Sequence, residues 1–217
     1  DNKTISIEDT GRGIRLADKH ESGKYMYDVF FLTLFAGTKY DKDKDAVNIG
    51  CNGVGACTLN YTSEYFKAES WYDGKYYSIA FNNGGEIAEP LKLNGKSDKH
   101  GTKITFKLDQ TAYTKPTIYE ANTLIDIISK ISGCTNNIKF KFIYKNETKE
   151  FYYETIKDYY GNNISENGFY LKQKTYDINN EVSKVQLVFG TDSNPKQWTM
   201  LNKNFLSEGG DINDGFI

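Results

Sequence analysis

The chain has 217 residues, of which 38% are hydrophobic and 26% charged, so it is long enough for one large domain or two small ones. The formal net charge of −2 excludes a strongly basic nucleic-acid-binding coat, although a local basic patch remains open. The longest largely apolar run, Val29–Phe35, is far shorter than a membrane span, so we expect no membrane segment. Three cysteines without CxxC spacing and two histidines argue against a disulfide scaffold or zinc site and for a reducing compartment.

The first half of the chain opens with one strand and two helices. Thr4–Glu8 alternates and is rich in β-branched residues, which predicts a short strand ending at Asp9. The dense apolar residues of Tyr25–Phe35 predict a buried helix. The polar, charged segment Ala36–Asn52 predicts a loop, and Gly53–Tyr61 predicts the start of another helix.

Strands separated by turn signals follow. The predicted strands are Glu64–Tyr72, Lys75–Phe81, Glu86–Leu91 and Thr102–Leu108. Between them, Asp73-Gly74 and Asn83-Gly84 have the residues that tight hairpins need at positive φ. We therefore expect an α+β fold with a largely antiparallel sheet.

The pattern changes near residue 112, where we place a domain boundary. The second half then predicts a helix at Ile118–Ile131 and strands at Ile138–Tyr144, Glu147–Tyr153, Phe169–Tyr176, Val182–Phe189 and Trp198–Phe205. This gives two domains, residues 1–112 and 113–217.

The first motif that could carry chemistry is Asp9-Thr10-Gly11-Arg12-Gly13-Ile14, at the end of the first predicted strand. A carboxylate there can accept a hydrogen bond from an exocyclic amine such as that of adenine, and glycines allow a flat ring to approach the backbone. Taken alone, the pattern is more typical of a simple turn after a strand.

The second motif is Gly50-Cys51-Asn52-Gly53-Val54-Gly55-Ala56, which leads into a predicted helix. Glycines before a helix N-terminus expose N–H donors beside the positive end of the helix dipole, which suits a phosphate. No βαβ pattern surrounds the motif and no Walker lysine follows it, so it is neither a Rossmann nor a P-loop fingerprint. A plain loop-to-helix turn remains an even alternative.

The third motif, Gly101-Thr102, opens a predicted strand. The Thr102 hydroxyl could join Asp9 in holding the adenine edge through a water molecule. By itself this pair carries little information.

In order and spacing, the three motifs resemble the nucleotide-binding boxes of the Bergerat-type ATPases. Within that superfamily, the chain most resembles the ATPase subunit of type IIA DNA topoisomerases, including gyrase B-like and phage large subunits. The stretches of this chain that carry the resemblance are Asp9–Ile14, His20, Gly23-Lys24, Phe35-Ala36-Gly37-Thr38-Lys39-Tyr40-Asp41, Asn52-Gly53-Val54-Gly55, Tyr152–Tyr160 and Phe205–Gly210.

The resemblance implies a Bergerat-type α/β sandwich, with helices on one face of its sheet, followed by an α+β transducer domain. It also implies a role for each matching residue. Asp9 would hold the adenine amine with help from Thr102, and Gly13 and Ile14 would line the base. The full implied nucleotide site comprises Asp9, Gly11, Gly13, Ile14, Thr38, Lys39, Gly50, Asn52, Gly53, Val54, Gly55, Ala56 and Thr102. Thr38 and Lys39 would approach the ribose or phosphate from a lid, and the segment from Gly50 to Ala56 would wrap the triphosphate.

The chain departs from the family pattern at two places. Arg15 stands where the family usually has proline, and Asp211-Ile212 stands where a Thr-His pair is expected, so no role is carried over onto that pair. The family's general-base glutamate and magnesium-binding asparagine lie on a helix upstream of the first motif, and its switch lysine lies further downstream than Ile217. We therefore expect neither a catalytic residue nor a metal ligand within these 217 residues.

The implied parent protein is an ATP- and Mg²⁺-dependent type IIA topoisomerase, an isomerase that passes one DNA duplex through a double-strand break. Its expected partners are DNA, a second copy through the ATPase region, and a DNA-cleavage subunit or domain. Its expected location is the cytoplasm of a bacterial or phage-infected cell, or the nucleus in a eukaryote. Two alternatives stay open: another Bergerat-type ATPase of the mismatch-repair or chaperone kind, and a nucleotide-binding scaffold without turnover.

A further candidate for DNA contact is the set of lysines in the second half, Lys139, Lys141, Lys145 and Lys149. Alternating lysines on a strand could form a basic stripe toward DNA. Such lysines are more often the solvent face of the strand.

We predict that a chain of these 217 residues does not hydrolyse ATP in steady state, because it lacks the implied glutamate and asparagine. A coupled ATPase assay checks this on a sample that mass spectrometry shows to start at Asp1. Steady turnover by that sample would contradict the prediction.

Overall fold

The structure is a computed structural model that describes residues 3–36, 54–115 and 119–160, together with the backbone of residues 169–178, 181–189, 199–201 and 204–206. The chain divides into two compact units, Asp1–Tyr119 (unit 1) and Glu120–Ile217 (unit 2). The sequence pattern placed this change somewhat earlier, near residue 112.

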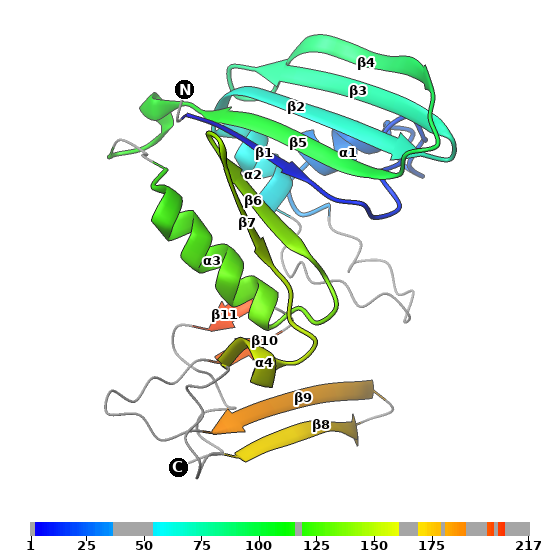
Figure 1. Cartoon of the computed structure of the whole chain (residues 1–217). Coiled ribbons are helices and arrows are strands. Elements are labelled where there is room, and N and C mark those ends of the chain that lie inside the picture. The colour runs from blue at the N-terminus through cyan, green and yellow to red at the C-terminus, as the bar shows by residue number, and fades with distance from the viewer. Residues whose placement is uncertain are drawn as a thin grey trace. The chain divides into compact units, whose positions relative to one another are not determined.

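Unit 1 is a five-stranded antiparallel sheet with two helices on one of its faces (Figure 1). Its elements are β1 (Thr4–Glu8), α1 (Met26–Leu32), α2 (Gly55–Tyr61), β2 (Ser63–Tyr72), β3 (Lys75–Asn82), β4 (Glu86–Lys96) and β5 (Gly101–Leu108). The strands lie in the order β1-β5-β2-β3-β4, so β1 pairs with the last strand of the unit. The predicted α+β class and largely antiparallel sheet are confirmed.

Three phenylalanine rings form the centre of the core between α1 and the sheet. The ring of Phe31 on α1 lies 5.2 Å from that of Phe66 on β2 and 6.2 Å from that of Phe81 on β3, centroid to centroid. All three side chains are buried, and Leu16, Ala68, Ile79, Phe106 and Leu108 complete the cluster. On β2 and β5 the residues of this cluster alternate with polar or half-exposed neighbours, which explains why the pattern predicted these strands well.

The two predicted turns adopt the expected backbone conformation. Asp73 and Gly74 have φ of 52° and 69°, as a two-residue hairpin between β2 and β3 requires. Asn83 and Gly84, between β3 and β4, have φ of 47° and 76°. The local residue types therefore determine how these strands connect.

Helix α1 ends at Leu32, earlier than the predicted Phe35, because side chains of α2 take over its last carbonyl groups. Asn60 Nδ2 donates to the Phe31 carbonyl at 3.0 Å, and the Tyr61 hydroxyl donates to the Leu32 carbonyl at 3.0 Å. These are groups that a helix end leaves unpaired. The chain then turns, and Phe35 has φ of 60°.

Strand β4 continues to Lys96, beyond the predicted end at Leu91. Pro90 lies within this strand, although proline cannot donate to a sheet. In the structure the β3–β4 register shifts opposite this part of the strand, and β4 lies at the edge, where proline is tolerated.

Unit 2 contains α3 (Ala121–Gly133), β6 (Phe140–Tyr144), β7 (Glu147–Phe151), α4 (Ile156–Tyr160), β8 (Phe169–Ile178), β9 (Glu181–Phe189), β10 (Thr199–Leu201) and β11 (Asn204–Leu206). The strands form three antiparallel pairs, β6-β7, β8-β9 and β10-β11. The single predicted strand Trp198–Phe205 is wrong, because β10 and β11 are two short strands that pair with each other. Among the described residues, no helix has the length and apolar character needed to cross a membrane.

We predict that Phe66→Ala lowers the free energy of unfolding by about 3–5 kcal/mol, because it removes a buried ring and leaves a cavity in the core. The matched control is Ile87→Ala on β4, whose side chain is 49% exposed. This control should change stability by no more than about 0.5 kcal/mol. Urea unfolding of both variants checks the prediction, and equal midpoints would contradict it.

Candidate functional site

The antiparallel pairing of β1 with β5 brings the first and third motifs together. Glu8 lies opposite Lys103, and one step further the Asp9 N–H donates to the Thr102 carbonyl at 2.9 Å. Asp9 therefore emerges at the end of β1 directly beside the start of β5. The side chain of Thr102 is only 8% exposed.

The Asp9 carboxylate has one oxygen committed within its own loop. The Gly11 N–H donates to Asp9 Oδ1 at 2.7 Å, a local turn that fixes the orientation of the carboxylate. A carboxylate has a second oxygen that can accept hydrogen bonds. This oxygen is the group that could receive an amine from a ligand.

Two glycines allow the loop to pack directly against other backbone. Gly13 has φ of +80°, and a Cβ there would lie 2.4 Å from the carbonyl oxygen of Trp71 at the end of β2. Gly101 has φ of +126°, and a Cβ there would lie 2.0 Å from the carbonyl oxygen of Asp9. No other residue type fits either position without moving the backbone.

Ser70 holds the end of the loop, although no sequence motif pointed to it. The Ile14 N–H donates to Ser70 Oγ and Ser70 Oγ donates to the Ile14 carbonyl, both at 2.8 Å. Ser70 is fully buried and lies opposite Thr102 in the β2–β5 register. The signal that could have found it is a serine at the position where β2 alternation, after Phe66 and Ala68, expects an apolar residue.

Ile7 adds an exposed apolar surface beside Asp9. It lies opposite Ile104 on β5, and alternation along β1 places it on the same face as Ile5, which packs against the core. Yet Ile7 is 61% exposed. An apolar side chain is thus available on the helix-bearing face next to the carboxylate.

Of the second motif, the structure describes only the part that begins α2. Val54 precedes the helix, and Gly55 and Ala56 form its first turn; the Val54 side chain makes no capping hydrogen bond. The first N–H groups of α2 are thus not occupied by a side chain of that residue. The predicted site residues Thr38, Lys39, Gly50, Asn52 and Gly53 lie outside the described residues.

Cys57, one residue further along α2, is a buried packing residue. Its side chain is fully buried, and this burial raises the pKa of the thiol. The thiol is therefore protonated at neutral pH and unsuited to act as a nucleophile.

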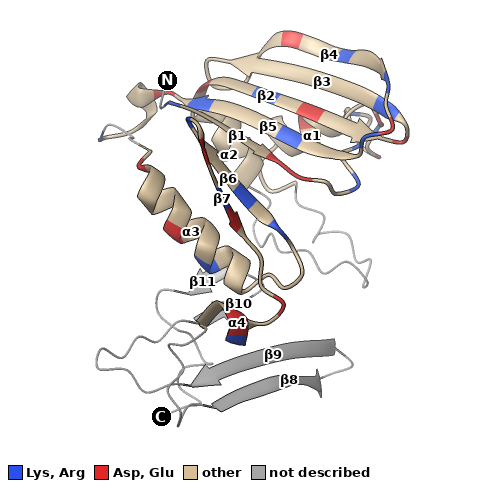
Figure 2. Ribbon diagram, in the orientation of Figure 1, with Lys and Arg blue, Asp and Glu red and all other residues tan. Residues whose placement is uncertain are grey.

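Basic and acidic residues are interspersed along the strands of the sheet (Figure 2), and several of those on the face opposite the helices form ion pairs. Lys99 Nζ lies 2.8 Å from Glu8, Lys103 Nζ lies 3.9 Å from Glu69, and Lys107 pairs with Glu64. Burial, followed by a hydrogen bond to Glu69, raises the pKa of Tyr76 to about 12. This pairing of charges makes the face a poor candidate for a DNA-binding surface.

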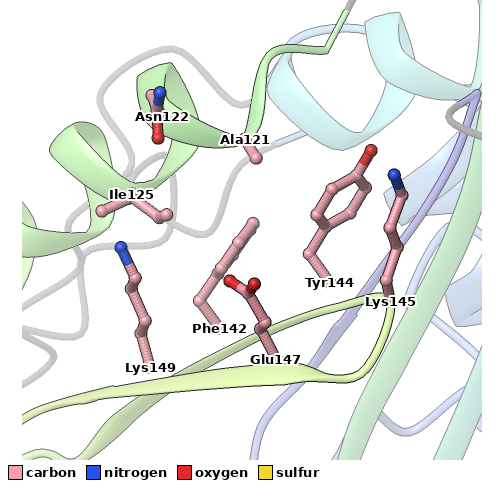
Figure 3. A pocket seen from close by; sticks show the side chains of 8 residues that line it. All are labelled: Ala121, Asn122, Ile125, Phe142, Tyr144, Lys145, Glu147 and Lys149. Carbon is pink, nitrogen blue, oxygen red and sulfur yellow. The ribbon is translucent and has the colours of Figure 1, made fainter.

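Unit 2 has a small cavity between α3 and the β6–β7 hairpin (Figure 3). It is lined by Ala121, Asn122, Ile125, Phe142, Tyr144, Lys145, Glu147 and Lys149. Its volume of about 240 Å³ is below the usual size of a ligand site. Of the candidate basic stripe, Lys139 and Lys141 share one carboxylate, that of Glu150, at 3.7 and 3.0 Å, so one of its four positive charges is compensated by this residue.

No metal centre is formed by the described part of the chain, in which no group of three or more His, Cys, Asp or Glu side chains could hold an ion. The described site at the ends of β1 and β5 offers a carboxylate oxygen, a buried threonine, closely packed backbone and an exposed apolar side chain.

No protein-family model matches the chain. It is, however, 37% identical over 136 residues to the B subunit of DNA topoisomerase 4 from Staphylococcus aureus strain MW2, and it matches the same protein of strains COL and MRSA252 equally well. These matches cover 63% of this chain and 20% of the relative. Over this part of its length, the chain resembles the ATPase subunits of type IIA DNA topoisomerases.

The fold agrees with this relationship. The structure matches the 43K ATPase domain of Thermus thermophilus gyrase B with a TM-score of 0.62 and 24% sequence identity, over 80% of this chain and 45% of that one. The chain spans about a fifth of the length of the curated relatives that it matches. The resemblance inferred from the motifs is confirmed, whereas the individual roles of the site residues stay predictions.

We predict that Gly13→Ala destabilises the fold of unit 1 far more than Gly23→Ala. Both glycines have almost the same φ, +80° and +81°, so both variants carry the same backbone strain. A Cβ at Gly23 meets nothing within 4 Å, whereas a Cβ at Gly13 meets the Trp71 carbonyl. We expect a loss of about 1 kcal/mol for Gly23→Ala and at least about 3 kcal/mol for Gly13→Ala in denaturant unfolding. Equal losses would show that the close approach at Gly13 does not matter.

Proposed function

We propose that this chain is the ATP-binding and transducer part of an ATP-dependent type IIA DNA topoisomerase, which passes one duplex through a double-strand break in another. The observation that carries the proposal is the meeting of Asp9 and Thr102 at the glycine-lined ends of β1 and β5. The relationship to the B subunit of DNA topoisomerase 4 supports the assignment.

Asp9 would read the adenine edge. Its Oδ1 already accepts the Gly11 N–H, so the other oxygen would accept the exocyclic amine of the base. Thr102 would assist through a water molecule, and Gly13 and Ile14 would line the ring. The exposed side chain of Ile7 supports this role, because an aromatic base needs an apolar wall.

The triphosphate would lie at the start of α2. Gly50, Asn52, Gly53, Val54, Gly55 and Ala56 would supply N–H donors there, and Thr38 and Lys39 would approach from the lid. The Val54 side chain makes no capping hydrogen bond at the start of α2, which supports this placement. Mg²⁺ would be bound through the phosphates and through the upstream asparagine that the family resemblance implies.

In the complete protein, unit 2 would act as the transducer that passes the nucleotide state to a DNA-cleavage subunit or domain. Two copies would dimerise through their ATPase regions around a DNA duplex. The bacterial relatives support a cytoplasmic location.

The named relatives are topoisomerase subunits, which disfavours the mismatch-repair and chaperone alternatives. ATP-dependent relaxation of supercoiled DNA by the complete enzyme separates a topoisomerase from a nucleotide-binding scaffold without turnover. A scaffold would bind ATP and leave DNA topology unchanged.

We predict that Asp9→Asn weakens ATP binding by at least about 10-fold, equivalent to one lost hydrogen bond to a charged group. In asparagine an NH₂ group replaces the second carboxylate oxygen, so when its oxygen accepts the Gly11 N–H it presents a donor, and no acceptor, to the adenine amine. Isothermal titration calorimetry with a non-hydrolysable ATP analogue measures the affinity.

The matched control for this prediction is Asp73→Asn in the β2–β3 turn, where φ of 52° suits asparagine. It makes the same chemical change away from the site and should leave affinity unchanged. Absence of nucleotide binding by the wild-type protein, or equal affinity of the Asp9 variant, would refute the proposed function.

A further inference from the structure

The connection between β4 and β5, residues Ser97 to His100, contacts the loop that carries Asp9. We call this connection the strap. His100 Nδ1 lies 2.8 Å from the carbonyl oxygen of Gly11, across 89 positions of sequence. The next two residues of the chain are Gly101 and Thr102, so the strap joins the two halves of the candidate adenine site.

The geometry determines which ring nitrogen of His100 carries the proton. A carbonyl oxygen can only accept, so His100 Nδ1 must be the donor. His20 shows the opposite arrangement, because its Nδ1 accepts the Ser22 backbone N–H at 3.2 Å. When neutral, the two histidines are therefore protonated on different nitrogens.

A second contact holds the strap in place. Lys99 Nζ lies 2.8 Å from a Glu8 carboxylate oxygen and 3.6 Å above the ring centre of Trp71. Trp71 is also the residue whose carbonyl oxygen packs against Gly13. The strap is thus fixed to the strand before the loop and to the residue on which the loop packs.

The two contacts of Gly11 explain why the histidine matters. Glycine has the greatest backbone freedom of any residue, and Gly11 sits between Asp9 and Gly13. Its N–H is held by the Asp9 carboxylate and its carbonyl by His100. Loss of the His100 contact releases the carbonyl side of Gly11, and with it the group that orients the Asp9 carboxylate.

We propose that His100 is a positioning residue for the adenine site, which holds the Asp9 loop in its binding conformation by donating a hydrogen bond from Nδ1 to Gly11. This inference rests on the proposed nucleotide-binding function. It adds to that function a residue outside the implied nucleotide site, acting on the ligand through Gly11 and Asp9.

The test compares His100→Leu, which removes the donor, with His100→Asn, whose Nδ2 occupies the position of the imidazole Nδ1. His20→Leu serves as the matched control, because it removes the other histidine from a separate turn. Three quantities are measured: ¹⁵N NMR of the imidazole nitrogens, hydrogen exchange of the Asp9 and Gly11 amides without nucleotide, and the affinity for a non-hydrolysable ATP analogue.

In the wild-type protein, we expect the neutral imidazole of His100 to carry its proton on Nδ1 and that of His20 to carry it on Nε2. His100→Leu should speed exchange of the two amides and weaken analogue binding, each by about 3- to 10-fold, as loss of one hydrogen bond implies. His100→Asn should restore both to near the wild-type values. His20→Leu should change neither.

The inference is overturned if Nε2 of His100 carries the proton, if His100→Leu leaves affinity unchanged, or if His100→Asn is as impaired as His100→Leu. Failure of the proposed function looks different, since the wild-type protein itself would then not bind the analogue. In that case, faster amide exchange in His100→Leu would show that the His100 contact orders the Asp9 loop, but the loop would bind no nucleotide.

Discussion

The pairing of β1 with β5 is the constraint on which the candidate site depends. These strands come from opposite ends of unit 1, and their register sets Asp9 against Thr102. The backbone approaches so closely that both Gly13 and Gly101 must lack a side chain. A shift of one residue in this register would turn Ile5 and Ile7 away from the helices and separate the carboxylate from the threonine.

Much of unit 1 could be predicted from local pattern. Strand β1 has the predicted bounds, and β2, β3 and β5 differ from prediction by at most one residue at either end. These strands alternate between an apolar core face and a polar face, and Asp-Gly and Asn-Gly pairs mark their turns. Where residues close together in the chain determine the local conformation, the sequence alone predicts the strand or turn.

The features that were missed depend on partners distant in sequence. The early end of α1 results from Asn60 and Tyr61, which belong to another helix. Ser70 looks like any serine in a strand until its contact with Ile14 is known, and His100 looks like a solvated turn residue until its contact with Gly11 is known. Such contacts leave no periodic signal, so only the folded structure reveals them.

Strand β4 has a consequence for how two copies of this chain could associate. It forms the outer edge of the sheet, and an edge strand with free backbone groups invites another strand to join it. Here Pro90 removes one N–H donor, the register shifts against β3 interrupt the regular ladder, and Glu86, Glu89, Lys92 and Lys96 place charge along the edge. Continuation of the sheet into a second molecule on this side is therefore disfavoured, and a dimer of the proposed kind would have to form through other surfaces of the ATPase region.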